Sequence, residues 1–232
     1  MRLVWINGPF GIGKTTVAEK LIERWPEAIL YDPELIGALL RILLPAPLNK
    51  GDFQDIPLWR RLVRVTAIEM LSQYEKPLVV PMTLVVPAYF EEIVGGLRQE
   101  GVHVDHFTLV ASDETIMARV RGSDREEWAV SQLQRCLDGL RDPRFARHID
   151  VDTASADVVA DEIASSVLVG ARLANRATRR ATEEGAGQVD DSGGQARTTP
   201  LQRDHPAVEL PNLSCLLAVR LGLPATTGSE NA

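Results

Sequence analysis

The residues with the most specific chemistry lie in a glycine-rich segment near the N-terminus. The segment GPFGIGKT, Gly8–Thr15, fits the pattern G-x-x-x-x-G-K-[ST]. Glycines let successive backbone amides point into one concavity, the lysine adds a full positive charge, and the next hydroxyl is placed to hold a magnesium ion. Such a loop binds a nucleoside triphosphate with Mg²⁺. The expected nucleotide contacts are Gly8, Pro9, Phe10, Gly11, Ile12, Gly13, Lys14, Thr15 and Thr16.

A carboxylate follows the second predicted strand, where Tyr31–Glu34 reads YDPE. Asp32 is a candidate to accept a proton from an acceptor hydroxyl, or to hold the metal through water. The alternative is structural, because Asp is a favoured N-cap and Pro a favoured first helical residue. The end of the third predicted strand and the next two residues, up to Thr83, lack the Asp that many P-loop proteins place there for magnesium. We therefore expect Thr15 and Asp32 to bind the metal, and Thr83 to donate a hydrogen bond to a ligand or within the fold.

Arginines cluster after the fourth predicted strand and its short helix, at Arg119, Arg121 and Arg125. An arginine-rich lid over the phosphates would stabilise the charge that spreads in a phosphoryl-transfer transition state, because the guanidinium fork matches phosphate oxygens. The alternative is a solvated helix end whose arginines pair with neighbouring acidic residues. Together with Lys14 and Asp32, these arginines form the candidate catalytic set.

A proline-punctuated stretch, Asp52–Arg60, mixes aromatic rings, carboxylates and an amide. In a sheet protein of this order such an insertion lies over the acceptor side of the phosphate site, where aromatic faces hold a sugar or a base. The candidate substrate contacts are Phe53, Gln54, Trp59 and Arg60, beside Asp32 and Thr83. The alternative is that Phe53 and Trp59 bury their rings and anchor the loop on the core.

These residues need a scaffold, and the chain alternates short β-rich runs with helical patterns. That alternation predicts an α/β fold, an open, doubly wound sheet of five parallel strands with right-handed crossover helices. The type is that of P-loop NTPases and nucleoside-monophosphate kinases, with ligands at the carboxyl ends of the strands. Predicted strands are Leu3–Ile6, Ala28–Tyr31, Leu78–Pro81, Val104–Val110 and His148–Val151. Predicted helices are Lys14–Arg24, Pro33–Leu43, Pro57–Gln73, Pro87–Gln99, Glu114–Val120, Glu126–Leu140 and Ala156–Asn175.

Composition narrows the choice of partners. The 232 residues carry a net charge of −7 and no basic stripe, which argues against nucleic acid and favours a small-molecule substrate. Cys136 and Cys215 do not make a disulfide framework, so a cytoplasmic location is expected. A membrane-spanning helix needs about 18 consecutive apolar residues, and no such run is present. The N-terminus also lacks a signal-peptide pattern.

The composition changes after about Arg180. Ala181–Pro206 is rich in Gly, Ser, Thr and acidic residues and has almost no large apolar side chains, which predicts a flexible linker. Beyond it, Asn212–Leu223 carries leucines at helical spacing and predicts a short capped helix. The expected organisation is a P-loop kinase-like domain at 1–178, a disordered linker at 179–207 and a C-terminal tail at 208–232.

Several separated motifs, taken in order, resemble the bacterial tunicamycin resistance proteins, a branch of the P-loop kinase-like proteins. The motifs are Val4–Gly8, Phe10–Thr15, Tyr31–Glu34, Asp52–Gln54, Pro57–Arg60, Val80–Thr83 and His106–Leu109. The resemblance covers about residues 1–165, so the C-terminal tail lies outside it. It implies ATP binding at Gly8–Thr16 and protection against tunicamycin, a nucleoside antibiotic that mimics a uridine-diphosphate aminosugar.

Three functions are compatible with these patterns. The first is a Mg-ATP-dependent kinase in which Asp32 activates a hydroxyl of tunicamycin or a related uridine-containing compound. The second is an ATP-dependent protein that binds and sequesters the drug without chemistry, which the missing carboxylate after the third strand favours. The third is a nucleotide switch acting on a protein partner, for which the sequence shows no interaction face. The oligomeric state is left open.

Overall fold

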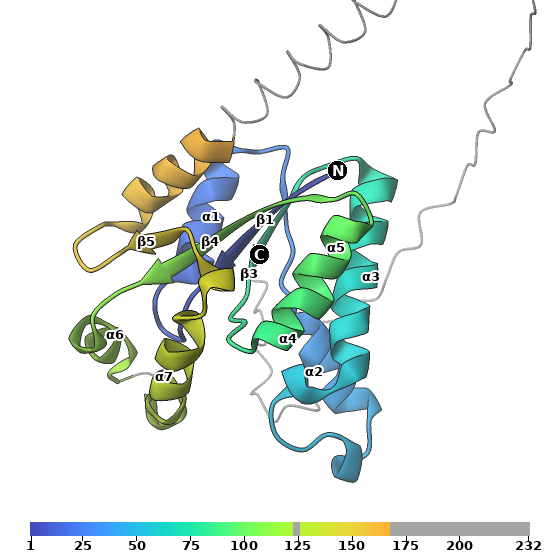
Figure 1. Ribbon diagram of the computed structural model, residues 1–232, viewed down its shortest axis with the longest axis horizontal. Helices are drawn as coiled ribbons and strands as arrows, with labels where there is room; N and C mark the ends of the chain where they lie inside the picture. The colour runs from blue at the N-terminus through green and yellow to red at the C-terminus, as the bar shows by residue number, and fades with distance from the viewer. Residues whose placement is uncertain (123–125, 168–232) are drawn as a thin grey trace, which may run out of the picture. The chain divides into compact units, whose positions relative to one another are not determined.

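The structure, a computed structural model, describes residues 1–122 and 126–167 (Figure 1). The chain divides into two units, Met1–Gly185 and Ala186–Ala232, and the second lies outside the described residues. Within the described part, the sheet consists of β1 (Arg2–Asn7), β2 (Ile29–Leu30), β3 (Leu78–Pro81), β4 (His103–Val110) and β5 (His148–Asp150). All strand pairs are parallel, and the spatial order is β2-β3-β1-β4-β5. The predicted five-stranded parallel sheet is confirmed.

Helices connect the strands and cover both faces of the sheet. They are α1 (Lys14–Arg24), α2 (Glu34–Leu43), α3 (Pro57–Tyr74), α4 (Pro87–Phe90), α5 (Gly96–Gln99), α6 (Asp113–Val120) and α7 (Glu126–Leu140). A further helix covers 156–167. Helix α1 and the helix at 156–167 lie on one face, and α3 and α5 lie on the other (Figure 1). This is the doubly wound arrangement that the alternation of strands and helices predicts.

The central strand shows how the core is divided. Successive side chains of a strand point to opposite faces of the sheet. Leu3 and Trp5 of β1 belong to the apolar cluster that includes α3 and α5, whereas Val4 and Ile6 belong to the cluster that includes α1. All four side chains are at most 1% exposed. A strand that is apolar on both faces belongs inside a sheet, and β1 lies between β3 and β4.

The ends of several predicted elements shift by one residue in the structure, and two elements differ more clearly. The predicted helix Pro87–Gln99 is divided into α4, a π-helical turn at Glu91–Gly95, and α5. A π turn contains one extra residue, which apolar periodicity does not distinguish from a continuous α-helix. The second strand is 2 residues long instead of Ala28–Tyr31, although the Tyr31 N–H still donates to the Val79 carbonyl at 2.9 Å. Neither difference changes the order of the strands.

The C-terminal predictions lie outside the described residues. They are the end of the last helix at Asn175, the linker Ala181–Pro206, the helix Asn212–Leu223 and the domain boundary at 178. Within 1–122 and 126–167, no helix is both long and apolar enough to cross a membrane.

Candidate active site

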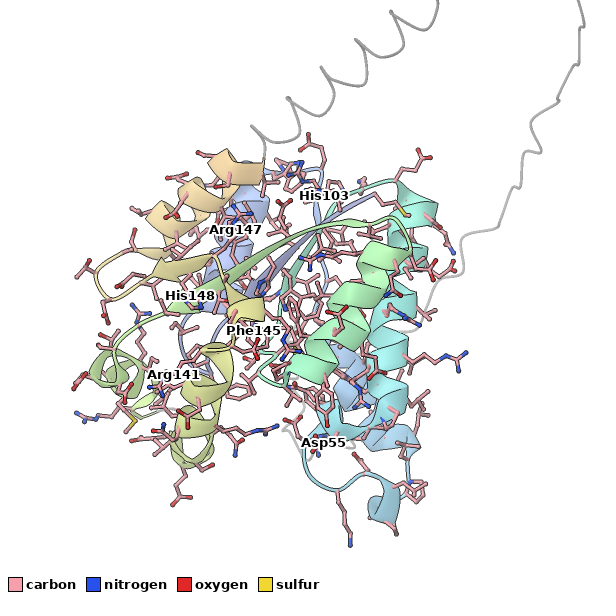
Figure 2. The ribbon with its side chains drawn as sticks, in the orientation of Figure 1. Asp55, His103, Arg141, Phe145, Arg147 and His148 are labelled. Atoms are coloured by element: carbon pink, nitrogen blue, oxygen red, sulfur yellow. The ribbon has the colours of Figure 1, made fainter. Side chains whose placement is uncertain are left out.

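The glycine-rich loop lies where the order of the sheet reverses. Strand β1 has β3 on one side and β4 on the other. The crossover that leaves β1 leads past β3 to β2 at one edge, whereas the crossovers that leave β3 and β4 lead toward the other edge. In open parallel sheets such a switch point opens a crevice above the carboxyl ends of the strands, and ligands bind there. The loop follows β1 directly and leads into α1, as predicted. Figure 2 shows Asp55 of the insertion beyond this end of the sheet, and His103 at the opposite end.

Two glycines shape the loop. Gly13, the residue before α1, has a φ of 103°, and Gly11 has a φ of 77°, a region that other residues rarely adopt. A Cβ at Gly11 would lie 2.1 Å from Cγ1 of Val120 at the end of α6, so this close approach also requires glycine. A Cβ at Gly13 would have no described atom within 4 Å. The loop is therefore closed against α6 at Gly11 and open at Gly13, where α1 presents its first backbone N–H groups.

Lys14, the first residue of α1, reaches back over the loop. Its Nζ donates to the Pro9 carbonyl at 3.0 Å and lies 5.6 Å from the centre of the Phe10 ring. Burial lowers the pKa of the Lys14 ammonium to about 8, and the Glu34 carboxylate partly opposes this shift. The ammonium is therefore protonated at neutral pH but poorly hydrated. A phosphate group beside it would replace the lost solvation, which suits the predicted role.

A buried polar network that sequence reasoning missed holds the first residue of the loop. Asn7 at the end of β1 is 0% exposed, and its Oδ1 accepts the N–H groups of Gly8 and Leu84, both at 2.8 Å. The Asn7 Nδ2 donates to the Leu84 carbonyl at 2.8 Å. Thr83 donates from Oγ1 to the Gly8 carbonyl at 2.8 Å, so its hydroxyl is occupied by the loop backbone. The sequence signal for this network is an Asn directly before the first loop glycine.

Asp32 lies between β2 and α2, and Thr15 and Thr16 lie in the first turn of α1. The Asp32 Oδ1 accepts the Glu34 N–H at 2.9 Å, which is the capping role that the sequence indicates. The residue is half-buried, and its Oδ2 has no hydrogen-bond partner among the described residues. Thr15 and Thr16 are exposed. One carboxylate oxygen is thus held by the helix, and the second is available to a ligand.

The three arginines of the predicted lid do not act as one group. Arg119 donates from Nη1 to the Ile12 carbonyl at 2.9 Å and from Nη2 to the Val151 carbonyl at 2.7 Å. It therefore joins the loop to the segment after β5. Arg121 follows the last residue of α6 and is exposed, and Arg125 lies outside the described residues. Because both hydrogen bonds hold its guanidinium group in place, Arg119 lines the site and is not part of a mobile lid. The lid hypothesis therefore depends on Arg121 and Arg125.

A small cavity of about 160 Å³ opens beside Arg119. The residues that line it are Ile12, Gly13, Thr16, Val17, Arg119, Val151, Ala154, Ala156 and Val159. Most of this wall is apolar, and it includes two residues of the loop and the first turn of α1. Sequence reasoning did not find the part formed by 151–159, because apolar residues after a strand have no pattern that distinguishes a ligand wall from the core.

The two aromatic rings of the insertion Asp52–Arg60 pack inward. Trp59 is 0% exposed, and its indole N–H donates to the Pro33 carbonyl at 3.1 Å. Phe53 packs on Trp59, with 5.1 Å between the ring centres, and it also fills the space above Gly37 of α2. Both rings therefore anchor the insertion on α2, which is the alternative that the sequence left open. Trp59 has no surface left for a substrate, contrary to the first expectation.

Arg60 and Gln54 of the insertion are also buried, at 9% and 3% exposure. The Arg60 Nε donates to Glu92 Oε2 at 2.6 Å, its Nη1 donates to the Gln54 carbonyl, and its guanidinium lies 4.2 Å from the centre of the Tyr89 ring. The Tyr89 hydroxyl in turn donates to Asp55 at 2.9 Å. The Gln54 Oε1 is buried without a hydrogen-bond partner in the described part of the chain. Arg60 thus positions the insertion, while Gln54 retains an unsatisfied acceptor atom.

Within the described residues, no three His, Cys, Asp or Glu side chains gather into a metal site. A nucleotide-bound magnesium ion does not need such a cluster, because Mg²⁺ keeps several waters and is held by substrate phosphates with one or two protein oxygens. The exposed Thr15 hydroxyl and the half-buried Asp32 carboxylate supply oxygens of the required type. The donor set fits Mg²⁺ that arrives with a nucleotide.

Comparisons with known proteins agree with this geometry. A family model described as an AAA domain matches residues 3–143. The solved structure of the Deinococcus radiodurans tunicamycin resistance protein shares 34% sequence identity with the chain. The match covers 72% of this chain and 95% of that one, with a TM-score of 0.63. The chain belongs to the tunicamycin resistance protein family. The resemblance noted from the sequence motifs is therefore confirmed.

The fold of this tunicamycin resistance family member also occurs in small-molecule kinases. A gluconokinase from Sinorhizobium meliloti 1021 matches at 21% identity over 76% of the chain and 95% of its own, with a TM-score of 0.51. A sugar kinase from Janibacter sp. HTCC2649 matches at 18% identity over 73% and 93%, with a TM-score of 0.50. At these identities the likeness shows the P-loop kinase-like fold alone. Comparison with curated protein sequences gives no match.

Proposed function

We propose that the chain binds Mg-ATP at Gly8–Thr16 and transfers the terminal phosphoryl group to a hydroxyl of tunicamycin or a related uridine-containing compound. The observation that carries this proposal is the loop itself. Its glycines hold an open concavity at the start of α1, and the poorly hydrated Lys14 ammonium lies over it at the switch point of the sheet. A half-buried cation beside the first backbone amides of a helix stabilises a polyphosphate.

The cavity beside Arg119 supports a nucleotide as the source of that polyphosphate. Its 160 Å³ is below the roughly 300–1,000 Å³ of sites that enclose a drug-sized ligand, which suits a ring system and not a whole nucleotide. The apolar walls match the faces of a purine base. Because Gly13 and Thr16 line this cavity and also belong to the loop region, one ligand can fill the cavity with its base and the loop with its phosphates.

Asp32 is the proposed general base. The acceptor oxygen attacks the terminal phosphorus, the bond to the bridging oxygen breaks, ADP leaves, and the hydroxyl proton passes to the Asp32 Oδ2. The Oδ1 stays bonded to the Glu34 N–H, which keeps the carboxylate in place. Mg²⁺, held by the Thr15 hydroxyl and through water by Asp32, would neutralise phosphate charge. Arg121 and Arg125 are the arginines proposed to close over the phosphates.

The insertion supports a uridine-like acceptor. A buried acceptor atom without a partner is costly, and most such atoms in proteins find a donor. The Gln54 Oε1 is such an atom, and a uracil ring carries one N–H donor that suits it. Phe53 of the same insertion packs on Trp59 but is only partly buried, and an aromatic ring is a suitable contact for a base. Recognition of the base would therefore depend on Gln54 and Phe53, with Arg60 holding the insertion in position.

The second candidate function is ATP-dependent binding of the drug without chemistry. One observation favours it: the segment that follows β3 consists of Met82 and Thr83, both buried, in place of a second carboxylate for magnesium. In that case Asp32 is a helix cap and a point of contact for the drug. The two candidates differ in whether the drug gains a phosphate group.

Mass spectrometry of tunicamycin after incubation with the protein and Mg-ATP tests this difference. We expect the wild type to add one phosphate group to the drug. Asp32→Asn keeps an oxygen for the Glu34 N–H, so it should keep its melting temperature and its ATP affinity, yet lose roughly a hundredfold in transfer rate. The matched control is Asp138→Asn, an exposed carboxylate on α7 that pairs with Arg141, and it should transfer at the wild-type rate.

The outcomes separate the candidates. An unmodified drug, together with intact ATP binding and protection of cells, would establish sequestration. Transfer at the wild-type rate by a folded Asp32→Asn protein would remove Asp32 as the base and leave it as a helix cap.

A further inference from the structure

A groove of about 390 Å³ lies between the first two turns of α3 and the π-helical turn Glu91–Gly95. The residues that line it are Pro57, Leu58, Arg60, Arg61, Arg64 and Glu92. None of them belongs to the glycine-rich loop or to the cavity beside Arg119. The groove is therefore a feature apart from the proposed nucleotide site.

The charge of this groove is opposite to that of the chain. Three arginines and one glutamate give it a net charge of +2, whereas the whole chain carries −7. Glu92 forms an ion pair with Arg60 at 2.6 Å, so the negative charge of Glu92 is balanced by Arg60. Among the described residues, neither Arg61 nor Arg64 makes a hydrogen bond or an ion pair with another side chain. Two guanidinium groups on one helix thus face a shared groove in which the one described carboxylate, Glu92, is paired with Arg60.

Arg64 is held in the groove by packing. Gly96 of α5 is buried, and a Cβ there would lie 2.5 Å from the Arg64 Nη1 and 2.7 Å from its Cδ. Glycine at this position therefore makes the space in which the Arg64 side chain lies. The π turn that precedes Gly96 also carries Glu92, the partner of Arg60. π turns inside helices are frequent at functional sites.

We propose that this groove binds a phosphate group, either free or as the phosphate ester of a small molecule. The forks of Arg61 and Arg64 match phosphate oxygens in geometry and charge. Pro57 and Leu58 add an apolar surface, with Leu58 43% exposed, which suits the carbon skeleton of an ester. Pro57 is also the first residue of an 18-residue helix, so the helix dipole adds positive potential there.

The test uses the full chain with Lys14→Met, which removes the main charge of the glycine-rich loop. Inorganic phosphate is titrated while the side-chain N–H signals of Arg61 and Arg64 are followed by NMR. We expect saturable shifts with a dissociation constant of about 1 mM, the scale of a few charge-assisted hydrogen bonds. Glycerol 3-phosphate, titrated in the same way, distinguishes a phosphate ester from free phosphate as the ligand. If the site is built for an ester, glycerol 3-phosphate should bind more tightly than the free ion, because its carbon skeleton contacts the apolar surface.

Variants then assign the site. Arg61→Gln combined with Arg64→Gln should weaken phosphate binding at least tenfold, and Arg61→Gln alone, at an exposed position, serves if the double variant does not fold. The matched control is Arg141→Gln, an exposed arginine on another part of the surface, which should change nothing. Shifts that grow without saturating, or phosphate affinity unchanged in the arginine variants, would overturn the proposal.

Discussion

Among single residues, Lys14 illustrates a conflict between stability and ligand binding. The ordinary pKa of a lysine ammonium is 10.5, and that of Lys14 falls to about 8 in the folded protein. Below about pH 8 the folded and unfolded states are both protonated, and the folded state bears the full penalty of a buried charge. Between pH 8 and pH 10.5 the folded state releases the proton first, so the contribution of Lys14 to stability rises with pH.

Lys14→Met should therefore raise the melting temperature at pH 7 and lower ATP affinity by roughly tenfold or more, since it removes a charge-assisted hydrogen bond to the phosphates. The gain in the free energy of unfolding should shrink as the pH rises from 8 to 10.5. Urea denaturation without nucleotide at pH 7 and pH 10, with ATP titration calorimetry, measures both effects.

Lys20→Met is the control for this prediction. Lys20 lies on the same helix, but a hydrogen bond to Glu23 raises its pKa, so removing it should give no stabilisation and no loss of ATP affinity. A lower melting temperature for Lys14→Met than for the wild type at pH 7 would contradict the expected effect of burial.

Substitutions of Thr83 test whether its hydroxyl contacts a ligand or makes a structural hydrogen bond. Its hydroxyl is buried and donates to the Gly8 carbonyl at 2.8 Å. Thr83→Val keeps the shape but leaves that carbonyl without this donor, so it should lower the free energy of unfolding by about 1–3 kcal/mol. Thr83→Ser keeps the donor and should lose less. Urea denaturation compares the stabilities of the two variants. Equal stability of the valine variant and the wild type would mean that the Thr83 hydroxyl does not stabilise the fold and is instead a candidate ligand contact.

At the scale of elements, the contact between the loop and α6 is open to a double-mutant test. Gly11→Ala introduces a Cβ at a φ of 77° and 2.1 Å from the Val120 Cγ1. The backbone strain and the overlap should together lower the free energy of unfolding by about 2 kcal/mol or more, and ATP affinity should fall because the loop moves. Val120→Ala in the same chain removes the overlap but not the strain.

Denaturation of the wild type, both single variants and the double variant measures the coupling between Gly11 and Val120. We expect a coupling of about 1 kcal/mol, with the double variant more stable than the sum of the single effects predicts. Additive effects would mean that α6 does not close on the loop at this point.

At the scale of the whole molecule, we propose that the folded domain is complete before the segment that begins at residue 181. The described sheet and its covering helices lie within 1–167, and the helix at 156–167 buries Val159, Ala160 and Ile163 in the core. Arg24 of α1 also pairs with Asp157 at 3.1 Å. These contacts support the proposal that the kinase-like domain spans 1–178 and that a linker and a tail follow it.

Two truncations test this boundary. Removal of 181–232 should leave the melting temperature and ATP affinity unchanged, because it touches none of the described contacts. Removal of 156–232 should unfold the protein, since it exposes the apolar face of the sheet that α1 shares with this helix. Circular dichroism and ATP titration measure both. Loss of ATP affinity in the shorter deletion would show that the tail contributes to the site.

Local patterns in the sequence determined the elements and the most specific part of the site. The pattern of Gly8–Thr15 requires a strand before it and a helix after it, and the structure has β1 and α1 there. The capping role of Asp32 was also visible, because N-cap chemistry acts within a few residues. Apolar runs and helical periodicity were sufficient to predict the five-stranded parallel sheet, because the spacing of apolar residues in each strand and helix indicates which of its faces is buried.

The tertiary structure alone decided which distant residues meet. Arg119 bonds to Ile12, 107 positions earlier in the chain, and Thr83 bonds to Gly8, 75 positions earlier. The burial of Trp59 and the cavity beside Arg119 also depend on contacts between segments that are distant in the sequence. Such contacts depend on the spatial order β2-β3-β1-β4-β5, which brings the ends of separate strands to one edge of the sheet. A local pattern carries no information on that order, because hydrogen bonding and packing between distant segments are satisfied only after the strands have paired.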